Sequence, residues 1–236
     1  MIEVVSVEQM RSSDAYTIKH HVSGKELMYR AAYGVYLAGK WKGRIAIVTG
    51  TGNNGGDGYA LGCIMADDSI TCTIIALGDA MTEDSRYYRK MAEEKGINIL
   101  PYIAGALDDY DIVVDCLLGT GFRGCPRDRY RIAIEEMDRI GAYVISVDIN
   151  SGMDGDTGRA ECAVHSDLTV TIGYVKQGLI ASCAGEHINK LVCVDIGITL
   201  LSSEGAVYDT HEQLNDLRGR SFERPEWLEM DVIKAY

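Results

Sequence analysis

The sequence has 236 residues, of which 47% are hydrophobic, enough for one large α/β domain or for one domain followed by a tail. A formal net charge of −12 excludes a surface built to bind nucleic acid or anionic membrane, and no apolar run approaches the roughly 20 residues of a membrane span. The seven cysteines form no C-x-x-C pair and the five histidines lack metal-ligand spacing, so we expect a reduced, cytoplasmic setting without a zinc site.

Helical and strand-like segments alternate along most of the chain. Ser6 followed by Gln9 forms a capping-box pattern, which predicts a helix through residue 21, and a second helix is expected at 25–40. An apolar segment at 45–48 predicts a buried strand, and a helix begins after the glycine-rich turn that follows it. Further strands are expected at 70–77, 97–100, 111–118, 142–149, 168–172 and 191–195, and further helices at 82–95 and 126–140.

This alternation predicts an α/β fold, a Rossmann-like three-layer sandwich with a mostly parallel central sheet and helices on both faces. The domain is expected to cover residues 1–202. Residues 203–236 are polar and acidic, and we expect a C-terminal tail that is partly helical at 209–217 and loosely held from 218 onward.

The glycine-rich turn contains G-x-G-x-x-G at Gly50, Gly52 and Gly55. Alone this is a weak signal, because many tight turns between a strand and a helix need glycine. Its tip, Asn53 to Asp57, is unusual because it adds two amides and a carboxylate to the backbone N–H groups that such a turn offers a phosphate. A simpler interpretation is that the asparagines take left-handed turn conformations and that Asp57 caps the helix.

Three further strand ends carry polar side chains. Asp115 precedes the loop 119–124, Asp148 precedes Asn150 and Ser151, and the last strand end leads into a loop with Lys176. Taken singly, each aspartate could cap a loop N–H, the serine could cap a helix and the lysine could lie on the surface. Because ligands bind beyond the carboxyl ends of parallel strands, we expect these groups to converge with the glycine-rich turn on one cleft.

These segments together resemble the NAD(P)H-hydrate epimerase family, the YjeF N-terminal domain, over roughly residues 7–200. The most specific matching segments are 53–58, 115–124 and 147–154, with weaker support from 27–32 and 176–179. The chain departs from the usual family residues at four positions, where the family has glutamate, glycine, proline and proline in place of Tyr29, Ala32, Asn150 and Gln177. Two of these positions adjoin the site, and two lie in the helical region through which family members often pair.

The resemblance implies a substrate-binding set. Its members are Asn53, Asn54, Gly55, Gly56, Asp57, Gly119, Thr120, Gly121, Phe122, Arg123, Gly124, Cys125, Asp148 and Lys176. It also implies one potassium ion per subunit, held by Asn54, Asp115 and Ser151. An amide, a carboxylate and a hydroxyl all offer the oxygen ligands that such a hard cation prefers.

The reaction implied by the resemblance is the interconversion of the R and S epimers of hydrated NADH and NADPH (NADHX and NADPHX) at C6 of the nicotinamide ring. Such a reaction needs a group that gives a proton and later accepts one. Asp148 is the first candidate for this catalytic role and Lys176 the second. The implied partners are a second copy in a homodimer and an ADP- or ATP-dependent NAD(P)H-hydrate dehydratase acting on the same metabolites.

Two other functions fit parts of the pattern. A Rossmann oxidoreductase would use Gly50, Gly52 and Gly55 for the pyrophosphate and an acid such as Asp79, near the end of the second strand, for the ribose. A non-catalytic nucleotide-binding or protein-interaction module of the same fold would not need the set of Asn54, Asp115, Asp148 and Ser151.

Overall fold

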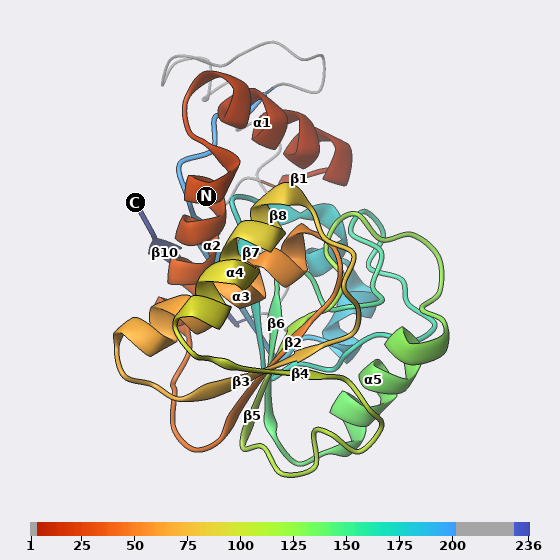
Figure 1. The fold of residues 1–236 in the computed structure, drawn as a ribbon. Helices are drawn as coiled ribbons and strands as arrows, with labels where there is room; N and C mark the ends of the chain where they lie inside the picture. The colour runs from red at the N-terminus through yellow and green to blue at the C-terminus, as the bar shows by residue number, and fades with distance from the viewer. Residues whose placement is uncertain (1–3, 202–228) are drawn as a thin grey trace.

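The computed structural model describes residues 4–201 and 229–236. Its centre is an eight-stranded sheet with the order β10-β9-β7-β6-β5-β2-β3-β4, in which every neighbouring pair is parallel (Figure 1). The strands are β2 (Ile45–Thr49), β3 (Cys72–Ala76), β4 (Asn98–Pro101), β5 (Ile112–Cys116), β6 (Tyr143–Val147), β7 (Leu168–Ile172), β9 (Lys190–Asp195) and β10 (Glu229–Lys234). Two short strands, β1 (Val4–Val5) and β8 (Val175–Lys176), pair with each other outside this sheet. The predicted parallel sheet is confirmed.

Of the five α-helices in the described residues, three begin after a serine or threonine whose hydroxyl caps the first turn. The five are α1 (Val7–His20), α2 (Gly24–Ala38), α3 (Asn53–Asp67), α4 (Glu83–Glu94) and α5 (Asp128–Arg139), with two 3₁₀ turns, η1 (Gln177–Ile180) and η2 (Ser182–Glu186). The Ser6 hydroxyl accepts a hydrogen bond from the Gln9 N–H at 3.1 Å, which is one half of the predicted capping box. The Gln9 side chain does not reach back to Ser6 but donates a hydrogen bond to the Leu201 carbonyl oxygen at 2.8 Å. Each helix predicted within the described residues is present, with ends displaced by a few residues at most.

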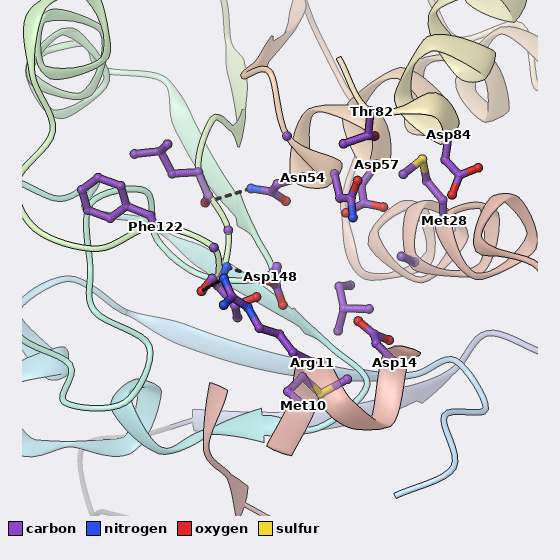
Figure 2. Close-up of a pocket in the computed structure, with 18 of the residues that line it drawn as sticks. Met10, Arg11, Asp14, Met28, Asn54, Asp57, Thr82, Asp84, Phe122 and Asp148 are labelled. Atoms are coloured by element: carbon purple, nitrogen blue, oxygen red, sulfur yellow. Dashed lines mark hydrogen bonds between the residues drawn. The ribbon is translucent and has the colours of Figure 1, made fainter. Parts of the chain in front are cut away.

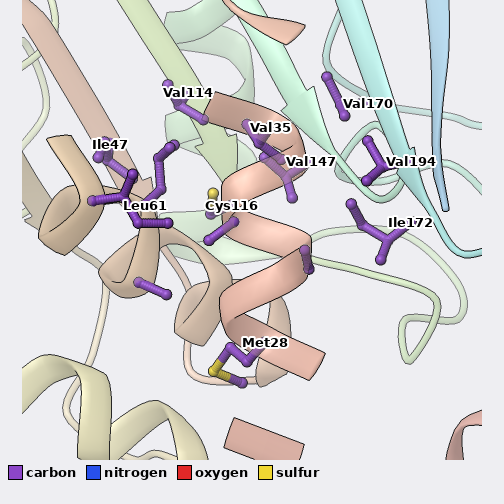
Figure 3. Close-up of a cluster of buried hydrophobic side chains, with 14 of the residues drawn as sticks. Met28, Val35, Ile47, Leu61, Val114, Cys116, Val147, Val170, Ile172 and Val194 are labelled. Atoms are coloured by element: carbon purple, nitrogen blue, oxygen red, sulfur yellow. The ribbon is translucent and has the colours of Figure 1, made fainter. Parts of the chain in front are cut away.

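The helices cover both faces of the sheet. Side chains of α2 and α3, such as Val35 and Leu61, pack on one face against Val114, Val147 and Val194 (Figure 3). On the other face α5 packs Ile134 against alternate strand residues. Because both faces are covered, the central strands are buried along almost their whole length, as expected for a parallel sheet. The three-layer arrangement is confirmed.

Helix α1 belongs to neither layer but crosses the carboxyl end of the sheet (Figure 1). It is tied to the segment that follows β9, because the Ser13 hydroxyl accepts a hydrogen bond from the Leu201 N–H and the Thr17 hydroxyl accepts one from the Thr199 N–H, both at 3.0 Å. The chain runs outward from β2 through β3 and β4 on one side and through β5, β6 and β7 on the other. The crevice at this change of direction is where ligands bind in open parallel sheets.

The prediction for the C-terminal segment needs a correction. Residues 229–234 are not loosely held but form β10, which pairs in parallel with β9 from Glu229 opposite Lys190 to Lys234 opposite Asp195. The predicted helix at 209–217 lies outside the described residues. None of the helices in the described ranges combines the length and apolarity that a bilayer crossing requires.

Candidate active site

A cavity of about 810 Å³ lies at the carboxyl ends of the central strands. Its walls come from α1, α2, the first turn of α3, the start of α4 and the loops after β5 and β6 (Figure 2). The four polar strand ends belong to β2, β5, β6 and β7, which are consecutive neighbours in the sheet. The expected convergence of these strand ends on one cleft is therefore confirmed.

The glycine-rich turn brings the backbone of α3 to this cavity. Gly52 is the N-cap of α3, and no side chain caps the first turn. The exposed N–H groups of a helix N-terminus attract anions, so this wall suits a phosphate. Asn53 and Asn54 are the first two residues of the helix, so the interpretation in which they form a left-handed turn and Asp57 caps the helix is wrong.

The glycines of this turn serve different purposes. A Cβ on Gly50 would lie 1.9 Å from the Leu117 carbonyl oxygen, which shows how closely the turn approaches the loop after β5. A Cβ on Gly55 would meet the Gly50 carbonyl oxygen at 2.2 Å, and one on Gly56 would meet the Ser85 hydroxyl at 2.5 Å. A Cβ on Gly52 would meet nothing within 4 Å. Gly55 and Gly56 are therefore required for packing behind the cavity wall, whereas Gly52 opens toward the cavity.

A buried polar network supports the floor of the site. Asp115 is fully buried, and its two carboxylate oxygens accept hydrogen bonds from the Leu117 N–H, the Ser146 hydroxyl, and the Ser151 N–H and hydroxyl at 2.5–3.1 Å. Burial raises the pKa of Asp115, and these hydrogen bonds oppose that shift. The Ser151 hydroxyl also accepts a hydrogen bond from the Leu118 N–H at 2.8 Å. The network ties the ends of β5 and β6 to each other.

Asn54 joins this network from the other side. Its amide Nδ2 donates a hydrogen bond to the Leu118 carbonyl oxygen at 3.0 Å (Figure 2). Its amide oxygen is buried and has no hydrogen-bond partner among the described residues. An unpaired buried oxygen is costly, and it has the chemistry of a cation ligand.

Asp148 and Lys176 form an ion pair at the base of the cavity. The Lys176 Nζ donates hydrogen bonds to Asp148 Oδ1 at 2.5 Å, to the Thr171 hydroxyl at 3.0 Å and to the Ile172 carbonyl oxygen at 2.7 Å. Only 1% of the Lys176 side chain is exposed, so the interpretation of this lysine as a surface residue is wrong. Asp148 has a φ of +67°, in the left-handed region, and its other oxygen accepts a hydrogen bond from the Thr120 N–H at 3.4 Å.

Two more carboxyl groups line the same cavity, Asp14 from α1 and Asp57 from α3 (Figure 2). Burial, with a smaller contribution from the Asp148 charge, raises the pKa of Asp14 to about 6, while Lys176 opposes that rise. Burial, together with the charges of Asp148 and Asp14, raises the pKa of Asp57 well above its usual value. The cavity thus holds three carboxyl groups and one lysine, and only Asp148 is hydrogen-bonded to that lysine.

The structure brings most of the predicted site residues together. Those that line the cavity are Asn53, Asn54, Asp57, Gly119, Thr120, Gly121, Phe122, Arg123, Asp148 and Lys176. Gly55, Gly56, Gly124 and Cys125 do not line it, and Asp115 and Ser151 lie buried behind its floor. Asp79, the ribose-binding residue of the oxidoreductase alternative, pairs with Arg89 at 3.0 Å and does not line the cavity.

Sequence reasoning missed the contribution of α1. Met10, Asp14 and Ile18 recur every four residues on one face of this helix and line the cavity, and Arg11 lies beside them and donates a hydrogen bond to the Thr120 carbonyl oxygen. A signal was present, because an aspartate between Met10 and Ile18 interrupts an otherwise apolar face. Nothing in the sequence indicated that this face would cover a strand end.

One departure from the family pattern has a structural explanation. Asn150 is fully buried, and its Nδ2 lies 2.9–3.0 Å from the Val164 carbonyl oxygen, the Ser166 hydroxyl and the His187 carbonyl oxygen. Its Oδ1 accepts a hydrogen bond from the Thr169 hydroxyl at 2.6 Å. This asparagine therefore fixes the loop after β6 by hydrogen bonding.

The fold and the site define an α/β protein with a ligand cavity at the carboxyl ends of a parallel sheet, beside a glycine-rich helix N-terminus. The family model described as YjeF-related protein N-terminus matches residues 24–178, so the chain belongs to this family.

Curated relatives carry two kinds of name. An NAD(P)H-hydrate epimerase of Rhodopirellula baltica is 34% identical over 166 residues, covering 67% of this chain and 68% of the relative, and one of Oenococcus oeni is 31% identical over 205 residues, covering 82% and 96%. A bifunctional NAD(P)H-hydrate repair enzyme Nnr of Pyrobaculum aerophilum is 39% identical over 165 residues, covering 66% of this chain. The chain spans 33–42% of the length of three such bifunctional relatives.

Among solved structures, yeast ynu0 superposes with a TM-score of 0.70 at 18% identity, covering 96% of each chain. At this identity the likeness supports the fold alone.

Proposed function

We propose that this protein is an NAD(P)H-hydrate epimerase that interconverts the R and S epimers of hydrated NADH and NADPH. The observation that carries the proposal is the convergence of the Asn53–Asp57 turn, Asp148 and Lys176 on one cavity, in a chain of this family. A volume of about 810 Å³ lies within the roughly 300–1,000 Å³ of small-molecule sites.

The cavity offers separate surfaces for the parts of a dinucleotide. Its phosphates suit the N-terminus of α3, and Arg11 and Arg123 at the cavity wall supply cations in a chain that is otherwise acidic. Arg123 is held by Asp156 at 3.3 Å, which positions its guanidinium at this wall. With the phosphates in this position, the hydrated nicotinamide ring lies near Asp148, the proposed proton-transfer group.

The chemistry needs proton transfer and no redox change. The C6 carbon bears a hydroxyl and is bonded to the ring nitrogen, so departure of the hydroxyl as water leaves an iminium centre that water re-enters from either face. Asp148 acts as the proton acceptor, because its carboxyl group lines the cavity while Lys176 directs all three of its N–H donors to fixed acceptors. Lys176 positions Asp148 and does not itself exchange protons with the ligand.

A potassium ion fits the polar network at the floor. The donors are Asn54, Asp115 and Ser151, and the unpaired amide oxygen of Asn54 supports their assignment as cation ligands. When bound, the ion would offset part of the ligand's negative charge and link three strand ends.

The cysteines and the curated relatives support a cellular compartment and a partner enzyme for this activity. The seven cysteines are all free, which suits the reducing cytoplasm. Because bifunctional repair enzymes are among the relatives, the S epimer formed here passes to an ADP- or ATP-dependent dehydratase. A homodimer through α2, whose Tyr29 and Leu37 are exposed, stays a prediction.

A coupled assay tests the function. A dehydratase specific for the S form is added to a mixture of R and S hydrates of NADH until recovery of NADH stops, and this protein is added next. Renewed recovery that Asp148→Asn abolishes supports the proposal. Recovery that stays stalled, with and without potassium, would reject catalysis and favour a binding module.

A further inference from the structure

We infer that Asp14 is the proton donor of this site, the group that protonates the departing C6 hydroxyl while Asp148 serves as the proton acceptor. The inference rests on the proposed function and adds a residue of α1 to it. Asp14 precedes residues 24–178, so the family match says nothing about it.

The first argument is that the Asp148–Lys176 pair has no N–H or O–H group free to point at a ligand. Lys176 directs its three donors to Asp148, Thr171 and the Ile172 carbonyl, and it would have to break one of these hydrogen bonds to reach a ligand. The Asp148 carboxylate is the hydrogen-bond acceptor in this pair and brings no donor of its own to the ligand. Loss of a hydroxyl as water needs a proton from another group.

The second argument is the position of Asp14. It projects from α1 into the cavity, on the same face of the helix as Met10 and Ile18, and its carboxyl lies among the lining residues (Figure 2). No described residue forms a hydrogen bond with this carboxyl, so it is available to a ligand. Asp14, Asp148 and Lys176 all line this cavity, which places the three groups around one space.

The third argument is that the two carboxyl groups lie in different environments. Two carboxyl groups in one site serve as acid and base when their environments push their pKa values apart. Asp148 is ion-paired, whereas Asp14 is half-buried and has no ion-pair partner among the described residues, and its pKa is raised to about 6 by desolvation. A group with such a pKa can give a proton and take it back.

The proton and electron balance of the step closes. Asp14 transfers its proton to the C6 hydroxyl oxygen, the C–O bond breaks with its electron pair on the departing water, and the lone pair of the ring nitrogen forms the iminium bond. A water molecule then adds to the other face of C6 and loses one proton to Asp148. Proton exchange with solvent returns Asp148 to the carboxylate and Asp14 to the carboxylic acid. One water leaves, one enters, and the product is the other epimer.

Asp57 is the competing donor, because it also lines the cavity and its pKa is also raised. It belongs to the turn that is proposed to bind the ligand, so its replacement should raise KM. Replacing Asp14 should lower kcat with little effect on KM.

The experiment measures kcat and KM from pH 5 to 9 for the wild type, Asp14→Asn, Asp14→Glu, Asp57→Asn and the control Glu8→Gln, after subtraction of the uncatalysed rate. Glu8 is exposed on the same helix and does not line the cavity. We expect Asp14→Asn to lower kcat by about 10²–10⁴-fold and to abolish the decline of kcat at alkaline pH, with KM changed less than about threefold. Asp14→Glu should retain the alkaline decline, and Glu8→Gln should match the wild type.

A kcat of Asp14→Asn within threefold of the wild type, with the same pH profile, overturns the inference and leaves the proposed function intact. The inference also fails if Asp57→Asn, and not Asp14→Asn, removes the alkaline decline. If Asp14→Asn does not fold, carbon-13 NMR titration of the wild-type Asp14 carboxyl decides: a pKa near 6 supports the role and a pKa near 4 overturns it. An inactive wild type rejects the proposed function itself, and the inference with it.

Discussion

The Lys176 ammonium lies 2.5 Å from Asp148 Oδ1, in a position where only 1% of the lysine side chain and 16% of the aspartate side chain are exposed. Lys176 is the last residue of β8 and Asp148 follows β6, and the pair fixes both segments at the base of the cavity. A buried charge that loses its partner costs about 3–5 kcal/mol, much more than an exposed pair.

Lys176→Met should therefore destabilise the protein by about 3–5 kcal/mol, because Asp148 is left without its ammonium. Urea unfolding followed by circular dichroism measures the change. The matched control is Lys190→Met, because Lys190 pairs with Asp231 at 2.9 Å where its side chain is 33% exposed and that of Asp231 is 63% exposed. We expect that control to cost at most about 1 kcal/mol. Equal losses for the two lysines would contradict the role of burial.

The left-handed backbone at Asp148 stores strain that glycine would relieve. Asp148→Gly should therefore be about 1 kcal/mol more stable than Asp148→Ala, since both lose the carboxylate and only alanine keeps the unfavourable Cβ. Thermal and urea unfolding compare the two. At the exposed helical position Glu135 the order should reverse, with glycine about 1 kcal/mol less stable than alanine. If glycine were more stable than alanine at both positions, or less stable at both, the left-handed φ of Asp148 would not explain the difference in stability.

Because Gly50 lies so close to the loop after β5, we expect alanine to cost much more stability at Gly50 than at the nearby Gly52. Gly50→Ala places a Cβ 1.9 Å from the Leu117 carbonyl oxygen, and a backbone atom cannot rotate away. We expect a loss of about 1–3 kcal/mol or more. Gly52→Ala meets no atom within 4 Å and should lose less than about 1 kcal/mol. Chemical denaturation of both variants tests this, and similar losses of stability would show that the turn accommodates a Cβ at position 50.

The raised pKa of Asp14 predicts a pH-dependent gain of stability on its replacement. The folded pKa of about 6 exceeds the unfolded value near 3.8, so the stability contributed by protonated Asp14 is present below about pH 4 and is lost as pH rises through 6. Asp14→Asn should then be about 1–2 kcal/mol more stable than the wild type at pH 8, after allowance for partial exposure, and similar to it at pH 4. Unfolding at both pH values measures this. The control Glu161→Gln, at an exposed loop position, should change the free energy of unfolding little at either pH. A gain of stability for Asp14→Asn that is the same at both pH values would contradict a raised pKa of Asp14 as its cause.

Potassium binding at Asn54, Asp115 and Ser151 predicts ion-specific stabilisation. At ten times its dissociation constant the ion should add about 1.4 kcal/mol, or about 3–6 °C in Tm, relative to tetramethylammonium chloride at the same concentration. Asn54→Ala should abolish the difference, because it removes the unpaired amide oxygen. Differential scanning calorimetry in the two salts tests this without reference to activity. An equal Tm in both salts for the wild type would contradict a potassium site.

Much of the fold and part of the site followed from local pattern. Apolar strand segments alternating with amphipathic helices are compatible with little other than a parallel sheet, and parallel strands place their carboxyl ends at one edge. For that reason the polar residues after β2, β5 and β6 could be assigned to one cleft from the order of the elements alone. The separate roles of Asn54 and Asp57 could not be predicted from the sequence, because asparagine and aspartate at this position suit either a helix cap or a ligand site.

By itself, the sequence determined the order of the helices and strands, the parallel sheet and the edge of the sheet that carries the polar site residues. These features follow from hydrophobic periodicity and from turn residues, which act over a few neighbours in the chain. Only the tertiary structure decided what surrounds each polar group. It placed α1 over the carboxyl ends of the strands, so that Asp14 faces a cavity whose lining includes loops more than a hundred residues away in the sequence. It buried Lys176 against Asp148, and it added residues 229–234 to the sheet as an edge strand. These outcomes depend on long-range packing and on desolvation, which no local pattern encodes.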